Sequence, residues 1–181
     1  KDYKNKLIEV EDFGNETIFK ILKKSKSKKF LYFKDIIKLL NQVQLVNDKK
    51  IKSFKNKYYK IPEYKNKILI KEANLFCEWY SKKNLSKNKR QNFNRKFKKI
   101  IKTLASRLKM KNNTFVHRDF HVSNLMLINN RIGVIDSQDA LIGNRAYDLA
   151  SLVDDVRLKT SKNLKNKIYN FYINSQKKID K

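Results

Sequence analysis

The sequence is poor in the residues that cross-link a chain or break its regular structure. It holds one cysteine (Cys77), one proline (Pro62) and three glycines among 181 residues. A single cysteine excludes a disulfide within the chain and is typical of a reducing compartment, so we expect a cytoplasmic protein. No apolar run approaches the roughly eighteen residues that a membrane-spanning helix needs, and no signal-peptide pattern is visible. We therefore expect no membrane partner.

Acidic residues are scarce as well. There are 17 of them against 44 lysines and arginines, which gives a formal net charge of +27. Such a surplus favours nucleic acid as a partner, because clustered lysines neutralise phosphates. The lysines, however, are scattered over loops and helix faces, and no aromatic strand or finger motif accompanies them. We interpret the charge as a solvated surface under a biased composition and expect no specific nucleic-acid partner.

One window escapes this lysine surplus. Residues 113–150 contain no lysine, and their three arginines stand against four aspartates. The window holds the run His117-Arg118-Asp119-Phe120-His121-Val122-Ser123-Asn124, and Asp136 follows twelve residues after Asn124. The rest of the chain is rich in lysine. We therefore interpret the lack of lysine in this window as a chemical requirement of a functional site.

The spacing of Asp119, Asn124 and Asp136 fits a site for phosphoryl transfer. Such a site needs one carboxylate to orient and deprotonate an acceptor hydroxyl, and an amide with a second carboxylate to hold magnesium over the phosphates. Asp119 is the predicted catalytic base, and Asn124 and Asp136 are the predicted ligands of Mg²⁺. Taken alone, each of these three residues would be interpreted as a turn former or as the cap of a helix or strand. Residues 125–128 and 132–135 are predicted strands of one hairpin, which would bring both metal ligands to the same end.

Neighbouring polar residues are expected to support this loop. His117 and Arg118 would pack and hydrogen-bond, whereas His121 lies inside the loop and could contact the acceptor. Asp148 begins a predicted helix and would accept hydrogen bonds from the loop amides. For Asp139 two roles stay open, since it could approach the metal or cap the following turn.

The chain as a whole is predicted to be α+β and mostly helical, without an internal repeat or a second domain. Apolar spacing predicts helices over 18–22, 30–46, 68–82, 93–108, 146–157 and 163–175. Residues 7–14 are predicted to form a short strand that runs into a turn, 114–116 a strand before the loop, and 47–67 a loop-like connection.

Three runs resemble one known family: 116–126, 135–140 and 143–150. They are similar to the aminoglycoside phosphotransferase and choline kinase-like family. Within it, the resemblance is strongest to bacterial anomeric sugar kinases that act on N-acetylmuramate and N-acetylglucosamine. Ser137 departs from the pattern, because an aromatic residue is more usual there. Asp136-Ser137-Gln138 in place of Asp-Phe-Gly disfavours a protein kinase.

The resemblance implies the C-terminal lobe of a protein-kinase-like fold, mostly helical with a small β-hairpin at the catalytic loop. Residues 1–14 would be the end of an upstream lobe and the interlobe hinge, and 15–181 an incomplete C-terminal lobe. ATP and Mg²⁺ are the implied cofactors, and backbone at Glu9, Val10 and Glu11 would meet the adenine.

The implied function is ATP-dependent transfer of a phosphoryl group to the hydroxyl of an amino sugar. Glu72 and Trp79 lie in a segment similar to a helix before the family's active site, and with His121 they are the candidates for substrate contact. The alternatives are an aminoglycoside kinase, a choline or ethanolamine kinase, or an inert fragment with a basic, nucleic-acid-binding surface. Because the phosphate-covering loop of the upstream lobe is not in the chain, we expect residues 1–181 alone to show little turnover.

Overall fold

The computed structural model describes residues 2, 4–5, 7–25, 27–52, 57–108 and 111–179, and it divides the chain into two compact units. The main unit joins residues 1–62 to 113–181, and the helical unit comprises residues 63–112. A second unit was not predicted from the sequence. Neither unit has a boundary at residue 14, so the division into a hinge and a lobe stays a prediction.

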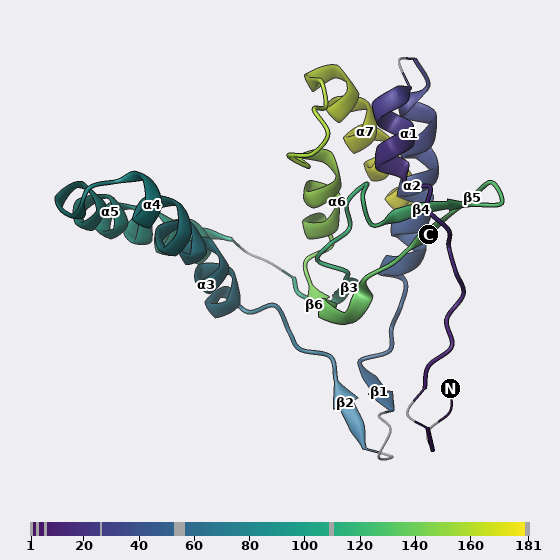
Figure 1. The fold of residues 1–181 in the computed structure, drawn as a ribbon, viewed down its shortest axis with the longest axis horizontal. Helices are drawn as coiled ribbons and strands as arrows, with labels where there is room; N and C mark the ends of the chain where they lie inside the picture. Colours follow the sequence, from purple (N-terminus) through teal and green to yellow (C-terminus); the bar gives the residue numbers. More distant parts are fainter. Residues whose placement is uncertain are drawn as a thin grey trace. The chain divides into compact units, whose positions relative to one another are not determined.

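Four helices form the body of the main unit (Figure 1): α1 (Ile18–Lys24), α2 (Lys29–Gln44), α6 (Ala146–Val153) and α7 (Lys162–Ile179). The helix α1 begins where the Thr17 hydroxyl accepts a hydrogen bond from the Lys20 amide at 3.2 Å, an N-cap. Phe33, Ile36 and Leu40 recur at helical spacing along α2 and are fully buried. They form one core with apolar residues of α1, α6 and α7, so the helical periodicity of the sequence is confirmed here.

Three two-stranded antiparallel sheets complete the main unit. The strand β3 (Thr114–Val116) pairs with β6 (Leu141–Gly143), and β4 (Leu125–Ile128) pairs with β5 (Arg131–Val134). The turn between β4 and β5 is made by Asn129 and Asn130, whose φ angles of 46° and 62° lie in the left-handed region that asparagine tolerates. The sheet of β1 (Lys50–Lys52) and β2 (Tyr58–Lys60) lies within the segment predicted as a loop, and that prediction is wrong there.

Residues 7–14 are the other correction. The segment is extended but belongs to no named strand, and among the described residues its ladder contact is the isolated bridge between Asp2 and Leu7. A strand needs hydrogen-bonded partners for its amides and carbonyls, and the described part of the chain pairs no strand with this segment. Gly14, at φ 68°, ends it in a left-handed turn, as expected from the glycine.

The helical unit consists of α3 (Asn66–Phe76), a π-helical turn η1 (Cys77–Ser81), α4 (Lys82–Asn84) and the long α5 (Lys87–Arg107). The predicted helix over 68–82 is therefore interrupted. The Ser81 hydroxyl is fully buried, where it contacts the Cys77 carbonyl at 2.6 Å and the Asn94 amide oxygen on α5 at 2.7 Å. Among the described residues, no helix of either unit is long and apolar enough to cross a membrane.

Candidate functional site

In the loop that follows β3, every second side chain is buried, and these buried side chains anchor the loop. Phe120 and Val122 are fully buried in the core of the main unit, whereas Asp119 and His121, which alternate with them, are half-buried. The amide of Phe19, in the first turn of α1, donates a hydrogen bond to the Val122 carbonyl at 2.9 Å. The loop is thus held by its apolar residues, and its polar side chains stay accessible.

Asn124 joins the two ends of this loop. Its side-chain amide donates to the Asp119 carbonyl at 3.1 Å, and its own carbonyl accepts a hydrogen bond from the Ile135 amide at 3.0 Å. Ile135 directly precedes Asp136. Three of the residues singled out from the sequence, Asp119, Asn124 and Asp136, therefore lie on chain segments that are hydrogen-bonded to one another.

Asp148 holds the beginning of the loop. One carboxylate oxygen accepts from the His117 amide at 2.8 Å and the other from the Arg118 amide at 3.0 Å, and the side chain is fully buried in the first turn of α6. These are the hydrogen bonds predicted for Asp148. Burial raises the pKa of the Asp148 carboxyl to about 6; the two amide hydrogen bonds oppose this rise, and the charge of Asp119 adds to it.

Two residues of the site have left-handed backbone although they are not glycine. Arg118 has a φ of 74° and Asp136 a φ of 73°. For arginine in particular this conformation is unusual, and such backbone is retained where the surrounding structure over-determines it, often at functional sites. Around Arg118, the Asp148 carboxylate fixes the amide, and the guanidinium donates a long hydrogen bond of 3.4 Å to the Asp139 carbonyl.

His117 is buried at the entrance of the loop, and its ring contacts Phe120 edge-on, with centroids 6.1 Å apart. Burial lowers the pKa of His117, although the charge of Asp119 opposes this, so the ring is neutral at physiological pH. This setting suits a packing role. It agrees with the support role predicted for His117, and the role itself stays a prediction.

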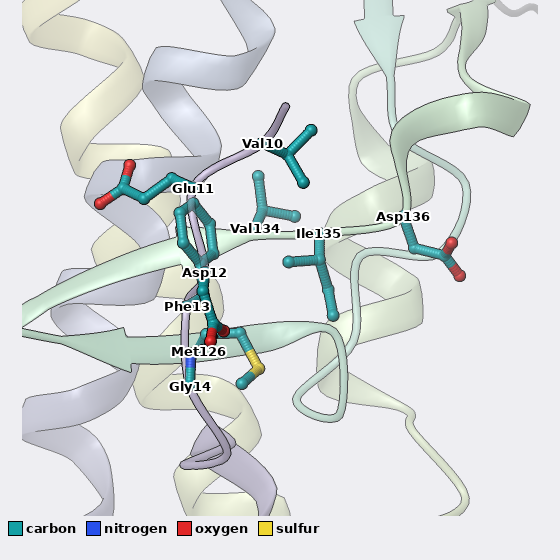
Figure 2. A pocket seen from close by; sticks show the side chains of 9 residues that line it. All are labelled: Val10, Glu11, Asp12, Phe13, Gly14, Met126, Val134, Ile135 and Asp136. Carbon is teal, nitrogen blue, oxygen red and sulfur yellow. Dashed lines mark hydrogen bonds between the residues drawn. The ribbon is translucent and has the colours of Figure 1, made fainter. Parts of the chain in front are cut away.

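An open pocket lies between residues 10–14 and the β4–β5 hairpin (Figure 2). Its lining includes Val10 and Glu11, two of the three residues predicted to meet adenine, but Glu9 is not part of it. Asp136 stands at the hairpin side of the same pocket. The remaining lining is mostly apolar and was not predicted: Phe13, Met126, Val134 and Ile135. In the sequence, the only indication of this lining is that the hairpin is apolar. The docking of residues 10–14 on the hairpin is a non-local contact, and no sequence pattern predicts it.

The substrate candidates are divided between the units. His121 belongs to the loop, whereas Glu72 and Trp79 belong to the helical unit, where Glu72 accepts a hydrogen bond from the Tyr64 hydroxyl and Trp79 is strongly exposed. Asp139 is exposed within the short 3₁₀ turn η2 (Ser137–Asp139). Both roles considered for it therefore remain predictions.

The oxygen donors of the loop fit magnesium better than a transition metal. Asn124 and Asp136 offer an amide and a carboxylate, and no group of three or more His, Cys, Asp or Glu side chains that could hold a metal occurs in the described ranges. Mg²⁺ is usually bound through one or two carboxylates together with substrate phosphates and water, so a small set of hard oxygens suits it.

Comparison with known proteins agrees with this geometry. Residues 20–173, most of the chain, match the model of the phosphotransferase enzyme family (APH). The chain belongs to this family. Its members share the protein-kinase-like architecture, and a mixture of helices with small antiparallel sheets is what the structure has.

Individual relatives are similar over about half of the chain. An N-acetylmuramate/N-acetylglucosamine kinase of Neisseria meningitidis serogroup B is 41% identical over 95 residues, which are 52% of this chain and 28% of that protein. Proteins of the same name from Pseudomonas aeruginosa and Pseudomonas putida are 35% and 30% identical over 95 residues, with the same coverage. The similarity thus spans 28% of the length of these relatives.

Proposed function

We propose that the chain provides the acceptor-side and metal-side groups of an ATP-dependent kinase for small molecules. The observation that carries the proposal is the hydrogen-bonded link from Asp119 through Asn124 to Ile135, which places a carboxylate, an amide and the Asp136 carboxylate on adjoining segments. Membership of the phosphotransferase family supports it.

In this proposal Asp119 is the catalytic base. Its half-buried carboxylate would accept a hydrogen bond from the acceptor hydroxyl, orient its oxygen toward the γ-phosphate and take up its proton as the new P–O bond forms. Asp148 contributes indirectly, because it fixes the backbone just before Asp119.

Asn124 and Asp136 would hold Mg²⁺, which when bound neutralises charge on the phosphates. The Asn124 side-chain amide already donates to the Asp119 carbonyl, so its Oδ1 is the atom left to face a cation. Asp136 is exposed and therefore accessible to a metal–nucleotide complex.

The pocket between residues 10–14 and the hairpin is the proposed place for the nucleotide base. Apolar side chains of Phe13, Met126, Val134 and Ile135 suit a flat aromatic ring. The backbone of the extended segment, at Val10 and Glu11, would supply polar contacts at its edge.

For the acceptor we propose an amino sugar of the N-acetylmuramate or N-acetylglucosamine type. The support is the similarity to three N-acetylmuramate/N-acetylglucosamine kinases, at 30–41% identity over 95 residues. His121, half-buried in the loop beside Asp119, is the proposed contact to the sugar within the main unit. Glu72 and Trp79 are further candidates.

The test is a comparison of acceptors with the full-length protein. N-acetylmuramate, N-acetylglucosamine, choline and an aminoglycoside are each supplied with ATP and Mg²⁺, and the phosphorylated product is measured. We expect kcat/KM to be highest for one of the two amino sugars by roughly tenfold or more, the size of effect that a few acceptor contacts supply. Preference for choline or the aminoglycoside would overturn the acceptor assignment, and no transfer to any acceptor would overturn the kinase assignment.

A further inference from the structure

The helical unit leaves its apolar side chains largely uncovered. No described residue of α3 is buried, and in α5 only Ala105 is. Phe76 stacks on Tyr80 and lies 6.1 Å from Phe93, yet all three remain exposed. Trp79 and the α5 residues Ile100 and Leu104 are 76%, 56% and 52% exposed, and we call these six apolar side chains together the aromatic face. Exposed apolar side chains in such number mark a surface that has a partner.

The same unit concentrates positive charge. It carries 16 of the 44 basic residues but only 3 of the 17 acidic ones, so nearly half of the net charge lies on little more than a quarter of the chain. The helix α5 alone has nine lysines and arginines and no acidic residue. A composition bias spread evenly over the chain does not produce this difference between the units. A partner that carries negative charge would therefore complement this unit.

Contrary to the expectation of no membrane partner, which concerned spanning helices, we propose that the helical unit docks on an anionic phospholipid surface, with the aromatic face in the acyl boundary and the α5 cations at the headgroups. A helix with lysines on one side and aromatic and aliphatic residues on the other lies in the membrane interface without spanning it. A second copy of the chain fits poorly, because two strongly positive units repel each other. Nucleic acid would pair with the lysines and could stack on the aromatic rings, but it offers no apolar partner to Ile100 and Leu104.

Trp79 makes this testable, because it is the only tryptophan of the chain. Its emission is recorded for residues 1–181 with vesicles of phosphatidylcholine alone and of phosphatidylcholine mixed with phosphatidylglycerol. We expect a blue shift, with quenching by brominated acyl chains, for the anionic vesicles only. The measurement needs no turnover, so it is independent of the proposed kinase chemistry.

Two matched pairs of charge reversals test which unit of the chain binds the vesicles. Lys96→Glu with Lys99→Glu changes exposed residues of α5, and Lys24→Glu with Lys28→Glu changes exposed residues of the main unit by the same charge. Since each basic residue near a membrane surface contributes on the order of tenfold or less to partitioning, we expect the α5 pair to weaken vesicle binding by roughly tenfold or more and the control pair much less. Circular dichroism establishes that both variants keep their helices.

The following outcomes would each overturn the proposal. Co-sedimentation with anionic vesicles without a shift of Trp79 emission would mean adsorption by charge alone. Equal losses in the two charge reversals would remove the helical unit as the docking surface. Binding of a single-stranded oligonucleotide but of no vesicle would make nucleic acid the partner, and a concentration-dependent dimer that excludes vesicles would make it a second copy.

Discussion

Asp119, Asn124 and Asp136 are fixed by the fold in different ways. Asp119 follows a backbone held by Asp148, Asn124 is held through its own side chain, and Asp136 sits in left-handed backbone at the end of β5. Substitutions at the three positions therefore differ in their side effects. At Asp136, asparagine is the informative replacement, since it tolerates left-handed backbone as aspartate does, whereas alanine adds strain.

We predict that Asp136→Asn weakens metal binding at the loop. With Mn²⁺ in place of Mg²⁺, paramagnetic broadening of amide NMR signals should centre on residues 119, 124 and 136, because the two proposed metal ligands lie on adjoining segments. The broadening should disappear in Asp136→Asn and persist in Asp35→Asn, which removes an exposed carboxylate that pairs with Lys38. Broadening that persists in Asp136→Asn would place the metal elsewhere.

Asp148 should titrate far above an ordinary aspartate. Because its pKa is raised to about 6, the folded protein binds this proton between about pH 4 and 6, where the unfolded chain has lost it. Its contribution to the free energy of unfolding therefore falls as the pH rises through this window and is constant above it. A carboxyl-carbon NMR titration should show a midpoint near 6, and a midpoint near 4 would contradict the account.

Asp148→Asn gives the matching stability test. Asparagine has one acceptor oxygen for two buried amides, so we expect a loss of about 1–3 kcal/mol in the free energy of unfolding. The advantage of the wild type over the variant should shrink from pH 4 to pH 6, as denaturant titrations at several pH values can measure. An advantage that grows over this range would mean that the carboxylate, not the acid, is favoured by folding.

At the scale of elements, the pocket proposed for the nucleotide depends on a close approach between residues 10–14 and the hairpin. A Cβ on Gly133 would lie 2.7 Å from the Phe13 ring and 2.8 Å from the Ile128 side chain. Gly133→Ala should therefore cost about 1–3 kcal/mol by overpacking, and less in a Phe13→Ala background.

Gly14→Ala is the control for this double-mutant cycle. Its φ of 68° makes alanine strained, and apart from its two chain neighbours no atom lies within 4 Å of the added Cβ. Its cost should consequently come from backbone strain and not from overpacking against the hairpin. Strict additivity of Gly133→Ala and Phe13→Ala, measured by chemical denaturation, would show that residues 10–14 do not dock on the hairpin in solution.

Elements with a local cause were predictable. The apolar stripe of α2 and the Asn129-Asn130 turn between β4 and β5 depend on residues close in sequence, and both are present. The strand β6 was missed because it pairs with β3, whose residues lie 25 to 29 positions earlier in the chain, from Val116–Leu141 to Thr114–Gly143. The π-helical turn at Cys77–Ser81 was missed as well; the contact that its buried Ser81 hydroxyl makes with Asn94 on α5 is tertiary and leaves no local sequence pattern.

At the scale of the molecule, the sequence offered candidates for the site but not the organisation into two units. His117, Asp119, Asn124 and Asp136 stand in a lysine-free window, so they could be singled out without coordinates, and their roles stay predictions. The helical unit was not predicted, because the change in lysine content after residue 112 was interpreted as a property of the site and not as a boundary. Family membership, shown by the match over residues 20–173, covers both units.

The central claim is that Asp119 orients and deprotonates the acceptor hydroxyl, and the turnover of Asp119→Asn in the full-length protein tests it most directly. We predict that kcat for N-acetylglucosamine or N-acetylmuramate falls by about 10²–10⁴-fold while ATP binding is nearly unchanged, because asparagine keeps the shape but accepts no proton. The control Asp35→Asn should leave both values as in the wild type. Turnover of Asp119→Asn within about twofold of the wild type would contradict the account, since a general base contributes far more than that.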